Sequence, residues 1–475
     1  MSMEKEMNTP RMPKLWEALL TMAVLVVVMA VAIMIYGVDP HIPMFIGALA
    51  AALMAIRLGY KWEVIEEFMI DGIHRVLQSL IILIVIGILV GVWLNAGVVP
   101  TMIYYGLKIL NPGTFLVATV LVCSVTSLAT GTSWGTAGTV GVALMGIGVG
   151  LGVNPAMTAG AIISGAYFGD KLSPFSETTN LAPAMAGTDV MTHVKFMLFP
   201  TGIVYAITLI FFGVLGFMQH GNGAADMTSV VELSNALEGL FHINPLLLLP
   251  PVIVIVAVAC KVPAIPGITL GVVVGAVMGL IFQDNCTLGT LLESATNGFS
   301  CETGISEIDE LLNSGGLMNM MYSISLAIIS MMFGGIMEGS HQLEVIVERL
   351  KKLAKTPATL VTLTEVTCVG SNVVMPEQYI SIVVPGRMYA EEYEKQGLHP
   401  KTLSNALESA GTVTSALVPW NTCGVFMATT LGISTVQYAP WAIFNWLMPI
   451  VVIIMAFMGI TVAGTDGERL SKKKI

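Results

Sequence analysis

Long apolar stretches, separated by short polar segments, run along most of the chain. A bilayer core of about 30 Å is crossed by roughly 20 apolar residues in a helix, and eight stretches approach or exceed that length. They predict membrane-spanning helices near residues 15–36, 42–58, 76–94, 196–218, 246–260, 265–283, 317–338 and 438–463. The pattern therefore indicates an all-α membrane protein.

Four further stretches are apolar but are interrupted by polar residues at their centres. Residues 155–182 and 402–432 are long, and we predict that each crosses the membrane as a broken helix. Residues 114–149 and 356–386 have Gly, Ser, Thr, Asn or Pro at their centres, and we predict re-entrant hairpins that do not cross. Interrupted backbone survives at membrane depth only where protein or water surrounds it. Together with the eight clear spans, this predicts ten crossings.

The two halves of the chain resemble each other in sequence. Gly91 precedes Gly334 by 243 positions, and Pro174 of the first broken helix precedes Pro419 of the second by 245. Each half has five predicted crossings, and an odd number inverts the second copy in the membrane. We expect two inverted repeats, each with one re-entrant hairpin and one broken helix. The predicted boundaries are 1–220 for the first repeat, 221–245 for an external linker and 246–475 for the second repeat.

Composition and charge agree with a membrane protein and predict its orientation. Only 11% of the 475 residues are charged, against roughly a quarter in soluble domains. The net charge of −10 argues against a nucleic-acid partner, which would need a basic surface. Of the 21 Lys and Arg residues, Lys108 alone falls in a predicted external loop, and Lys171 falls within a span. Because basic residues stay on the cytoplasmic side, we expect a multi-pass protein of the cytoplasmic (inner) membrane with both termini in the cytoplasm.

The first broken helix contains the most informative run, residues 165–183. It places Asp170, Lys171 and Glu177 inside a span, where a charge costs roughly 2.5–3.5 kcal/mol. Pro174 interrupts the helix and frees backbone carbonyls, and oxygen ligands suit a small hard cation. The predicted ion-binding residues are Asp170, Lys171, Ser173, Ser176, Glu177, Thr178, Thr179 and Asn180, with Na⁺ held by Asp170, Ser173, Glu177 and Thr178. The alternative is a structural ion pair between Asp170 and Lys171.

The other three interruptions extend the predicted site. Half-helix ends at such breaks present backbone groups and a dipole end to a ligand. The first hairpin contributes Thr130, Thr132 and Ser133, the second hairpin Ser371, Asn372 and Glu377, and the second broken helix Glu408, Thr412, Thr414, Ser415, Asn421 and Thr422. For a single hydroxyl, packing or a bond to its own helix is the alternative, and Glu408 could instead lie at the cytoplasmic entry of its span. The hypothesis rests on four polar breaks in two mirrored pairs.

The remaining chemistry-bearing residues give weaker signals. Glu338 and Glu365 are candidates for a proton path, with solvation at the membrane interface as the alternative. The seven histidines fall in predicted loops or at span ends, where we expect solvated side chains. No nucleotide-binding or hydrolase motif stands in a suitable context, and the scattered cysteines offer no metal or redox pair. We therefore predict no enzyme activity and no cofactor.

The motifs GTSWGTAGT (131–139) and GAIISGAYFGDKLSPFSETTNLAP (160–183) resemble the NhaC family of sodium/proton antiporters. The resemblance covers nearly the whole chain and implies exchange of Na⁺ for H⁺. It implies a site built from Asp170, Ser173, Ser176, Glu177, Thr178, Thr179 and Asn180, with the tips at Thr132-Ser133 and Ser371-Asn372 lining it. Some members resemble malate/lactate exchangers, so Na⁺- and H⁺-coupled exchange of a small carboxylate or amino acid stays as an alternative. The SNV run at 371–373 departs from the SNT pattern of carboxylate-transporting relatives. This departure weakens the alternative of carboxylate exchange. A passive channel is a further alternative.

We expect Na⁺ and a proton to compete for one site, because a carboxylate in a poorly solvated cavity binds a proton readily. Asp170 is expected to be the main carboxylate, with Glu177 next. Alternating exposure of the site to the two sides of the membrane then gives exchange. The expected partners are Na⁺, H⁺ and membrane lipid, and a homodimer stays open.

Overall fold

The computed structural model describes residues 10–221, 227–260, 262–301, 309, 312–375 and 377–470, and in these ranges the secondary structure is helical apart from two isolated β-bridges. The first half contains α1 (Leu15–Ala30), α2 (His41–Leu58), α3 (Trp62–Asn95), α4 (Val98–Ile109), α5 (Pro112–Thr130), α6 (Ser133–Thr136), the π-helical η2 (Ala137–Gly141), α7 (Val142–Gly150), α8 (Pro155–Leu172), α9 (Glu177–Ala186) and α10 (Val190–Gly221). The second half contains α11 (Met227–Leu240), α12 (Leu249–Ala259), α13 (Ala264–Phe282), α14 (Leu288–Asn297), α16 (Leu317–Gly339), α17 (Gln342–Lys351), α18 (Pro357–Val374), α19 (Ile380–Lys395), α20 (Pro400–Leu407), the π-helical η4 (Glu408–Thr412), α21 (Thr422–Leu431), α22 (Thr435–Tyr438) and α23 (Ile443–Phe457).

Within the described ranges, six helices are long and apolar enough to cross a bilayer: α2, α3, α5, α10, α13 and α16. A bent pair, Leu233–Leu240 with Pro245–Ala257, would make a seventh. This confirms the prediction of an all-helical membrane protein. The count of ten crossings stays a prediction. So does the non-crossing first hairpin, whose first arm, α5, is itself long enough to span.

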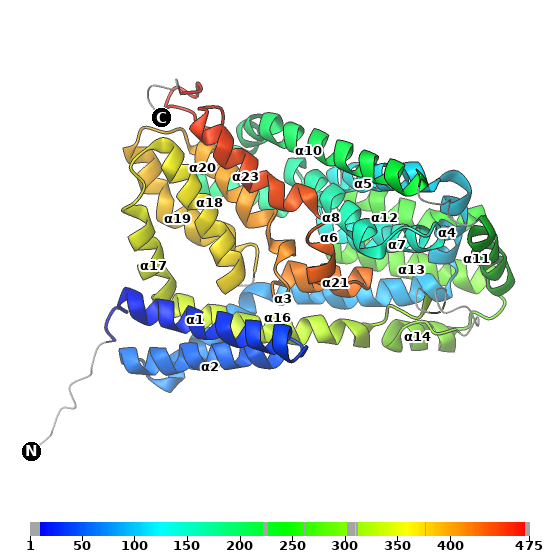
Figure 1. Ribbon diagram of the computed structural model, residues 1–475. Coiled ribbons are helices and arrows are strands. Elements are labelled where there is room, and N and C mark those ends of the chain that lie inside the picture. The colour runs from blue at the N-terminus through cyan, green and yellow to red at the C-terminus, as the bar shows by residue number, and fades with distance from the viewer. Residues whose placement is uncertain are drawn as a thin grey trace, which may run out of the picture.

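Helices α3 and α16 run side by side through the middle of the molecule (Figure 1). Glycines let their backbones touch at the crossing. A methyl group added to Gly72 would overlap the carbonyl oxygen of Met331, and one added to Gly335 would overlap the carbonyl oxygen of Phe68. Small residues at such crossings are typical of membrane helices, whose association depends on close packing. At the end of α16, Glu338 forms an ion pair with Arg75.

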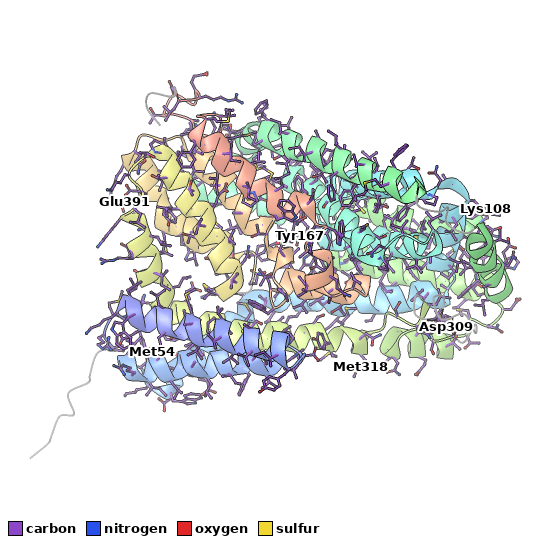
Figure 2. All side chains as sticks on the ribbon, in the orientation of Figure 1. Met54, Lys108, Tyr167, Asp309, Met318 and Glu391 are labelled. Carbon is purple, nitrogen blue, oxygen red and sulfur yellow. The ribbon has the colours of Figure 1, made fainter. Side chains whose placement is uncertain are left out.

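Short helices replace loops at one end of the molecule. The segments 95–113, 221–245 and 284–316 lie between the predicted spans and hairpins, and they contain α4, α11 and α14. These three helices lie at the opposite end from the start of α1 and the end of α23 (Figure 1). Figure 2 shows Lys108 of α4 and Glu391 of α19 at these opposite ends, with Tyr167 of α8 midway between them. The polar ends and the apolar middle fit a membrane crossing along this direction.

The order of elements in the first half recurs in the second. A long helix and a short one (α3–α4 and α16–α17) are followed by two helices separated by a polar tip (α5–α7 and α18–α19), and then by a helix broken at its centre. The last pieces, α9 (Glu177–Ala186) and α21 (Thr422–Leu431), are both ten residues long and stand 245 positions apart. This recurrence brings the four predicted polar breaks into comparable places in the two halves.

Candidate functional site

The first break separates α8 from α9. Hydroxyl groups of residues in and next to the break form hydrogen bonds with nearby backbone groups. The chain turns extended at Ser173, just before Pro174, and the Ser173 hydroxyl donates to the carbonyl of Leu128 in α5 at 2.8 Å. Ser176 caps α9 by accepting from the Thr179 amide at 3.4 Å. The Thr179 hydroxyl donates to the carbonyls of Asp170 and Lys171 at 3.0 and 3.1 Å. The backbone carbonyls at the end of α8 are therefore held by the protein.

The second break is held by two asparagines. Asn372, near the tip of the second hairpin, donates to the carbonyl of Gly411 at 2.8 Å and to the hydroxyl of Thr414 at 3.0 Å. Asn421 donates to the carbonyl of Asn372 at 3.1 Å and caps α21 by accepting from the Cys423 amide at 3.0 Å. Each hairpin tip thus packs against the broken helix of its own half.

A cavity of about 390 Å³ opens where these breaks meet. Three carboxylates line it: Asp170 and Glu177 beside the first break, and Glu377 after the second hairpin tip. Among the described residues that line it there is no Lys, Arg or His. The other polar lining residues are Ser79, Thr130, Thr132, Ser133, Ser176, Thr178, Gln378, Tyr379 and Cys423. The cavity therefore presents acidic and neutral oxygen atoms, the ligands that a hard cation prefers.

Asp170 is one of two buried carboxylates in the cavity wall, the other being Glu377, which is 2% exposed. Its residue is 4% exposed, and Oδ2 accepts from the Ser133 hydroxyl at 2.7 Å and from the Ser133 amide at 3.3 Å. The first hairpin tip, through Ser133, thus holds the carboxylate of the broken helix. A carboxylate buried with so few donors is poorly compensated for the loss of water. A bound proton or cation would compensate it.

Glu177 and Glu377 connect the two halves across the cavity. The Tyr379 hydroxyl donates to Glu177, and Glu377 accepts from the Tyr379 amide at 2.6 Å. On the neighbouring wall, Trp134 stacks on Phe426 of α21 with ring centres 4.3 Å apart. Residues from both halves therefore close on the same space.

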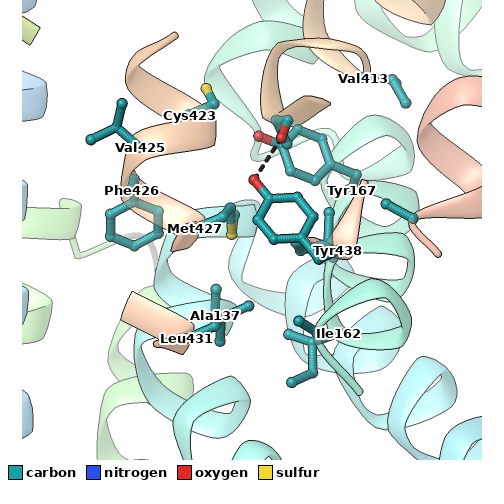
Figure 3. Close-up of a cluster of buried hydrophobic side chains, with 14 of the residues drawn as sticks. Ala137, Ile162, Tyr167, Val413, Cys423, Val425, Phe426, Met427, Leu431 and Tyr438 are labelled. Atoms are coloured by element: carbon teal, nitrogen blue, oxygen red, sulfur yellow. Dashed lines mark hydrogen bonds between the residues drawn. The ribbon is translucent and has the colours of Figure 1, made fainter. Parts of the chain in front are cut away.

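A cluster of buried side chains lies next to the cavity and shares Cys423 with its lining. Figure 3 shows Tyr167, Cys423 and Tyr438 within this cluster of buried hydrophobic side chains. The Tyr438 hydroxyl donates to the carbonyl of Ala416 at 2.6 Å, and the Cys423 thiol donates to Gln378 at 3.0 Å. The polar ends of Tyr438 and Cys423 are thus hydrogen-bonded within the protein.

The structure divides the sequence-predicted residues into two groups. Thr130, Thr132, Ser133, Asp170, Ser176, Glu177, Thr178 and Glu377 line the cavity. Lys171, Ser173, Thr179, Asn180, Ser371, Asn372, Glu408, Thr412, Thr414, Ser415, Asn421 and Thr422 do not belong to its lining. Most of the second group hold the breaks: Asn180, for example, donates to the carbonyl of Pro174 at 2.9 Å, and Ser415 donates to the carbonyl of Thr412 at 2.6 Å.

Sequence reasoning missed four polar cavity residues, Ser79, Gln378, Tyr379 and Cys423. Gln378 and Tyr379 directly follow Glu377, so the polar run after the hairpin tip was a signal for them. Cys423 carried no such signal.

One alternative, an entry position for Glu408, and one expectation, solvated histidines, need correction. Glu408 does not lie at an entry to its span: it is fully buried and accepts from Thr178 at 3.2 Å. His193 is not a solvated span-end histidine, because it is fully buried and its Nδ1 lies 2.8 Å from the Ser404 hydroxyl. An Asp170–Lys171 ion pair is also absent from the described residues. The Lys171 ammonium instead donates to Ser409 at 3.0 Å.

Comparison with known proteins identifies the family. The model of the Na⁺/H⁺ antiporter family matches residues 7–166 and 165–460. The chain belongs to this family. It is 37% identical over 444 residues to a Na⁺/H⁺ antiporter NhaC of Alkalihalophilus pseudofirmus, with 94% of this chain and 96% of the relative covered.

Members with other named substrates are similarly close. The chain is 37% identical over 455 residues to a malate-2H⁺/Na⁺-lactate antiporter of Bacillus subtilis, with 96% of each chain covered. It is 33% identical over 457 residues to the arginine/ornithine antiporter ArcD of Halobacterium salinarum, with 96% of this chain and 94% of the relative covered. The Na⁺/H⁺ antiporter family therefore contains proteins named for organic substrates, and the cavity has to be examined for both kinds.

Proposed function

We propose that the protein exchanges Na⁺ for H⁺ across the cytoplasmic membrane by alternating access, with the cation bound in the cavity beside Asp170. The observation that carries this proposal is the convergence of Asp170, Glu177 and Glu377 on one cavity at the helix breaks. Three carboxylates without a cationic side chain among the described lining residues make the space attractive to a cation and repellent to an anion.

Competition for Asp170 supplies the coupling. The Ser133 hydroxyl and amide hold one carboxylate oxygen in place, and the enclosed site leaves little water to stabilise the negative charge. Asp170 then binds either Na⁺ or a proton, with Ser176, Glu177 and Thr178 close enough to the same space to complete a cation site. Because an empty, charged site is unfavourable inside the membrane, the site changes sides loaded with one or the other.

The repeated order of elements supports two inverted repeats, 1–220 and 246–475, joined by an external linker at 221–245. Each repeat carries a re-entrant hairpin (114–149 and 356–386) and a broken helix (155–182 and 402–432), and the cavity lies between them. In transporters of this build, one bundle moves against the other around a fixed site.

The start of α1 and the end of α23 lie at one end of the molecule (Figure 1). Basic residues, such as those of α17, stay on the cytoplasmic side of a membrane. Together with the position of these helix ends, this supports cytoplasmic termini.

Exchange of a small organic substrate coupled to Na⁺ and H⁺ is the second candidate. The cavity volume of about 390 Å³ favours it, since a bare cation needs far less space. The acidic lining would suit the ammonium of an amino acid better than a dicarboxylate. An organic anion would need to pair with helix ends or with the bound Na⁺.

Transport by the purified protein in proteoliposomes tests both candidates. A pH-sensitive dye inside the vesicles reports proton movement when Na⁺, Li⁺, K⁺, malate, lactate or arginine is added in turn. Proton movement with Na⁺ alone supports simple exchange. Proton movement only when Na⁺ and an organic substrate are both present would favour the second candidate and reject simple exchange.

A further inference from the structure

A second group of ionisable side chains lies behind the cavity, on a different side of α8. It consists of Lys171 of α8, Glu365 of α18 and Glu408 of η4, all with 0% exposure. Lys171 interacts electrostatically with both glutamates. Its ammonium donates to the hydroxyl of Ser409 at 3.0 Å and to the sulfur of Met197 at 3.2 Å. We call Lys171, Glu365 and Glu408 the buried triad.

The triad does not balance its own charge. One ammonium and two carboxylates sum to one negative charge when all three are ionised, and a net charge sealed from water is strongly unfavourable. One bound proton makes the triad neutral. Glu365 is the group least able to stay ionised, because neither of its oxygens has a hydrogen-bond partner within the described part of the chain.

The described neighbours of the triad supply no compensating positive charge. Tyr393 of α19 and Cys368 of α18 interact with Glu365, and Asp170 adds a further negative field at Glu408. The remaining basic group nearby is His193 of α10, and repulsion from the Lys171 ammonium disfavours a second positive charge on it. A bound proton is therefore the species that neutralises the net negative charge of the triad.

A metal ion is a poor occupant of this place. The ammonium of Lys171 stands among the carboxylates and repels a metal cation. The triad and the cavity thus differ in what they can bind.

We propose that the buried triad is a second proton-binding site, separate from the cation site in the cavity, and that it carries one proton in each transport cycle. This inference rests on the proposed Na⁺/H⁺ exchange. Thr178 connects the two sites: it lines the cavity and its hydroxyl donates to Oε1 of Glu408 at 3.2 Å. A cation that binds beside Thr178 raises the positive field at Glu408 and favours release of the triad's proton.

Charge counting gives a direct test. Glu365→Gln leaves one ammonium and one carboxylate, which are neutral without a proton, and Glu408→Gln does the same. Both variants should therefore exchange one proton fewer per Na⁺ than the wild type. The ratio is measured in proteoliposomes held at zero membrane potential, as the Na⁺ gradient that just stops proton flow across an imposed pH gradient.

Glu391→Gln is the matched control, because the Glu391 side chain is 75% exposed and pairs only with Lys395 of its own helix among the described residues. It should keep the wild-type ratio. The proposal is overturned if Glu365→Gln and Glu408→Gln both keep that ratio, or if the wild type exchanges a single proton per Na⁺.

Infrared spectroscopy of the purified protein tests the triad without transport. At a pH where exposed carboxyl groups are ionised, the wild type should keep a protonated-carboxyl C=O band that shifts when glutamate is ¹³C-labelled. The band should be lost in Glu365→Gln and in Glu408→Gln. Its absence from the wild type overturns the proposal, even if a variant fails to fold. If the wild type moves no protons with Na⁺, the proposed function fails while the band still decides whether the triad holds a proton.

Discussion

The two helix breaks at the centre of the molecule are built alike but face different surroundings. Beside the first break, Asp170, Ser176 and Glu177 line the cavity. At the second break, Asn372 and Asn421 hydrogen-bond to each other and to neighbouring backbone instead. The comparison teaches that a repeated framework does not imply a repeated site: the first half supplies most of the polar residues that line the cavity, and the second half supplies fewer.

Asp170→Asn should have the largest effect, because it removes the enclosed carboxylate of the first break. An amide neither takes up a proton nor offers a full charge to Na⁺, so Na⁺-dependent proton flux should fall by about 10²-fold or more. The flux is measured in proteoliposomes with a pH-sensitive dye. Glu391→Gln is the control: its side chain is 75% exposed and pairs with Lys395 of its own helix, and flux should stay within about twofold. Full flux in Asp170→Asn would contradict the proposal that the transport path runs through the cavity.

Gly165→Ala should damage the first half more than Gly411→Ala damages the second. A methyl group on Gly165 would lie 2.5 Å from the backbone oxygen of Val120, whereas one on Gly411 would lie 3.0 Å from a side-chain carbon of Ile382 and from the backbone oxygen of Ser381. We expect a loss of about 1–3 kcal/mol for Gly165→Ala and less for Gly411→Ala. Thermal unfolding of the purified protein measures both.

Gly370→Ala is the matched control for the two glycine variants. It lies in α18, where an added methyl group meets nothing within 4 Å, so the unfolding temperature should stay or rise, since Ala favours a helix. Equal losses at all three positions would show that close backbone contact does not distinguish the halves.

Asn421→Ala should weaken the hydrogen bonding at the second break. It removes the donor to the carbonyl of Asn372 and the cap of α21, which should lower the free energy of unfolding by about 1–3 kcal/mol. Asn180→Ala is the counterpart in the first break, where the exposed amide donates only to nearby carbonyls. The expected loss there is smaller. A larger loss at Asn180 would reverse the comparison between the two breaks.

Tyr379→Phe should have the smallest effect, because it changes one hydrogen bond between the halves. The hydroxyl that donates to Glu177 disappears, while Asp170 and Ser133 stay in place. A hydrogen bond of about 1 kcal/mol corresponds to roughly a fivefold change in the apparent Na⁺ affinity, with maximal flux retained. Tyr104→Phe removes a similar donor to Glu238 in α11 and should leave the affinity unchanged. The same shift in both variants would show that the contact across the cavity has no special role.

Much of the fold could be predicted, because membrane spans have a strong local signal. The prediction for α2 was 42–58 against an observed His41–Leu58, and for α16 it was 317–338 against Leu317–Gly339. The interruptions at Ser173 and Val413–Asn421 were also predicted, since proline and polar residues stop an apolar helix locally. The short helices α4, α11 and α14 were predicted as loops. Helices at a membrane surface depend on packing against the bundle, and apolar length does not reveal them.

The candidate site could be predicted only as a set of residues near the breaks. Which hydroxyls line the cavity and which hold the backbone depends on partners far away in sequence. Ser133 reaches Asp170 across 37 positions, and Lys171 reaches Ser409 across 238. Asp170 and Lys171 are neighbours in the chain, yet successive residues on a helix point about 100° apart. The sequence indicated that both charges lie inside the membrane. It did not indicate that Asp170 and Lys171 have different neighbours.

By itself, the sequence determined that the chain enters the membrane, where its apolar helices lie and where they are interrupted, because hydrophobicity and backbone chemistry act over a few residues. Only the tertiary structure decided which interruptions share a cavity. It also decided that Lys171 stands with Glu365 and Glu408 rather than with Asp170. The physical reason is that electrostatic and hydrogen-bond energies inside a membrane depend on distance in space, and packing, not sequence spacing, sets that distance.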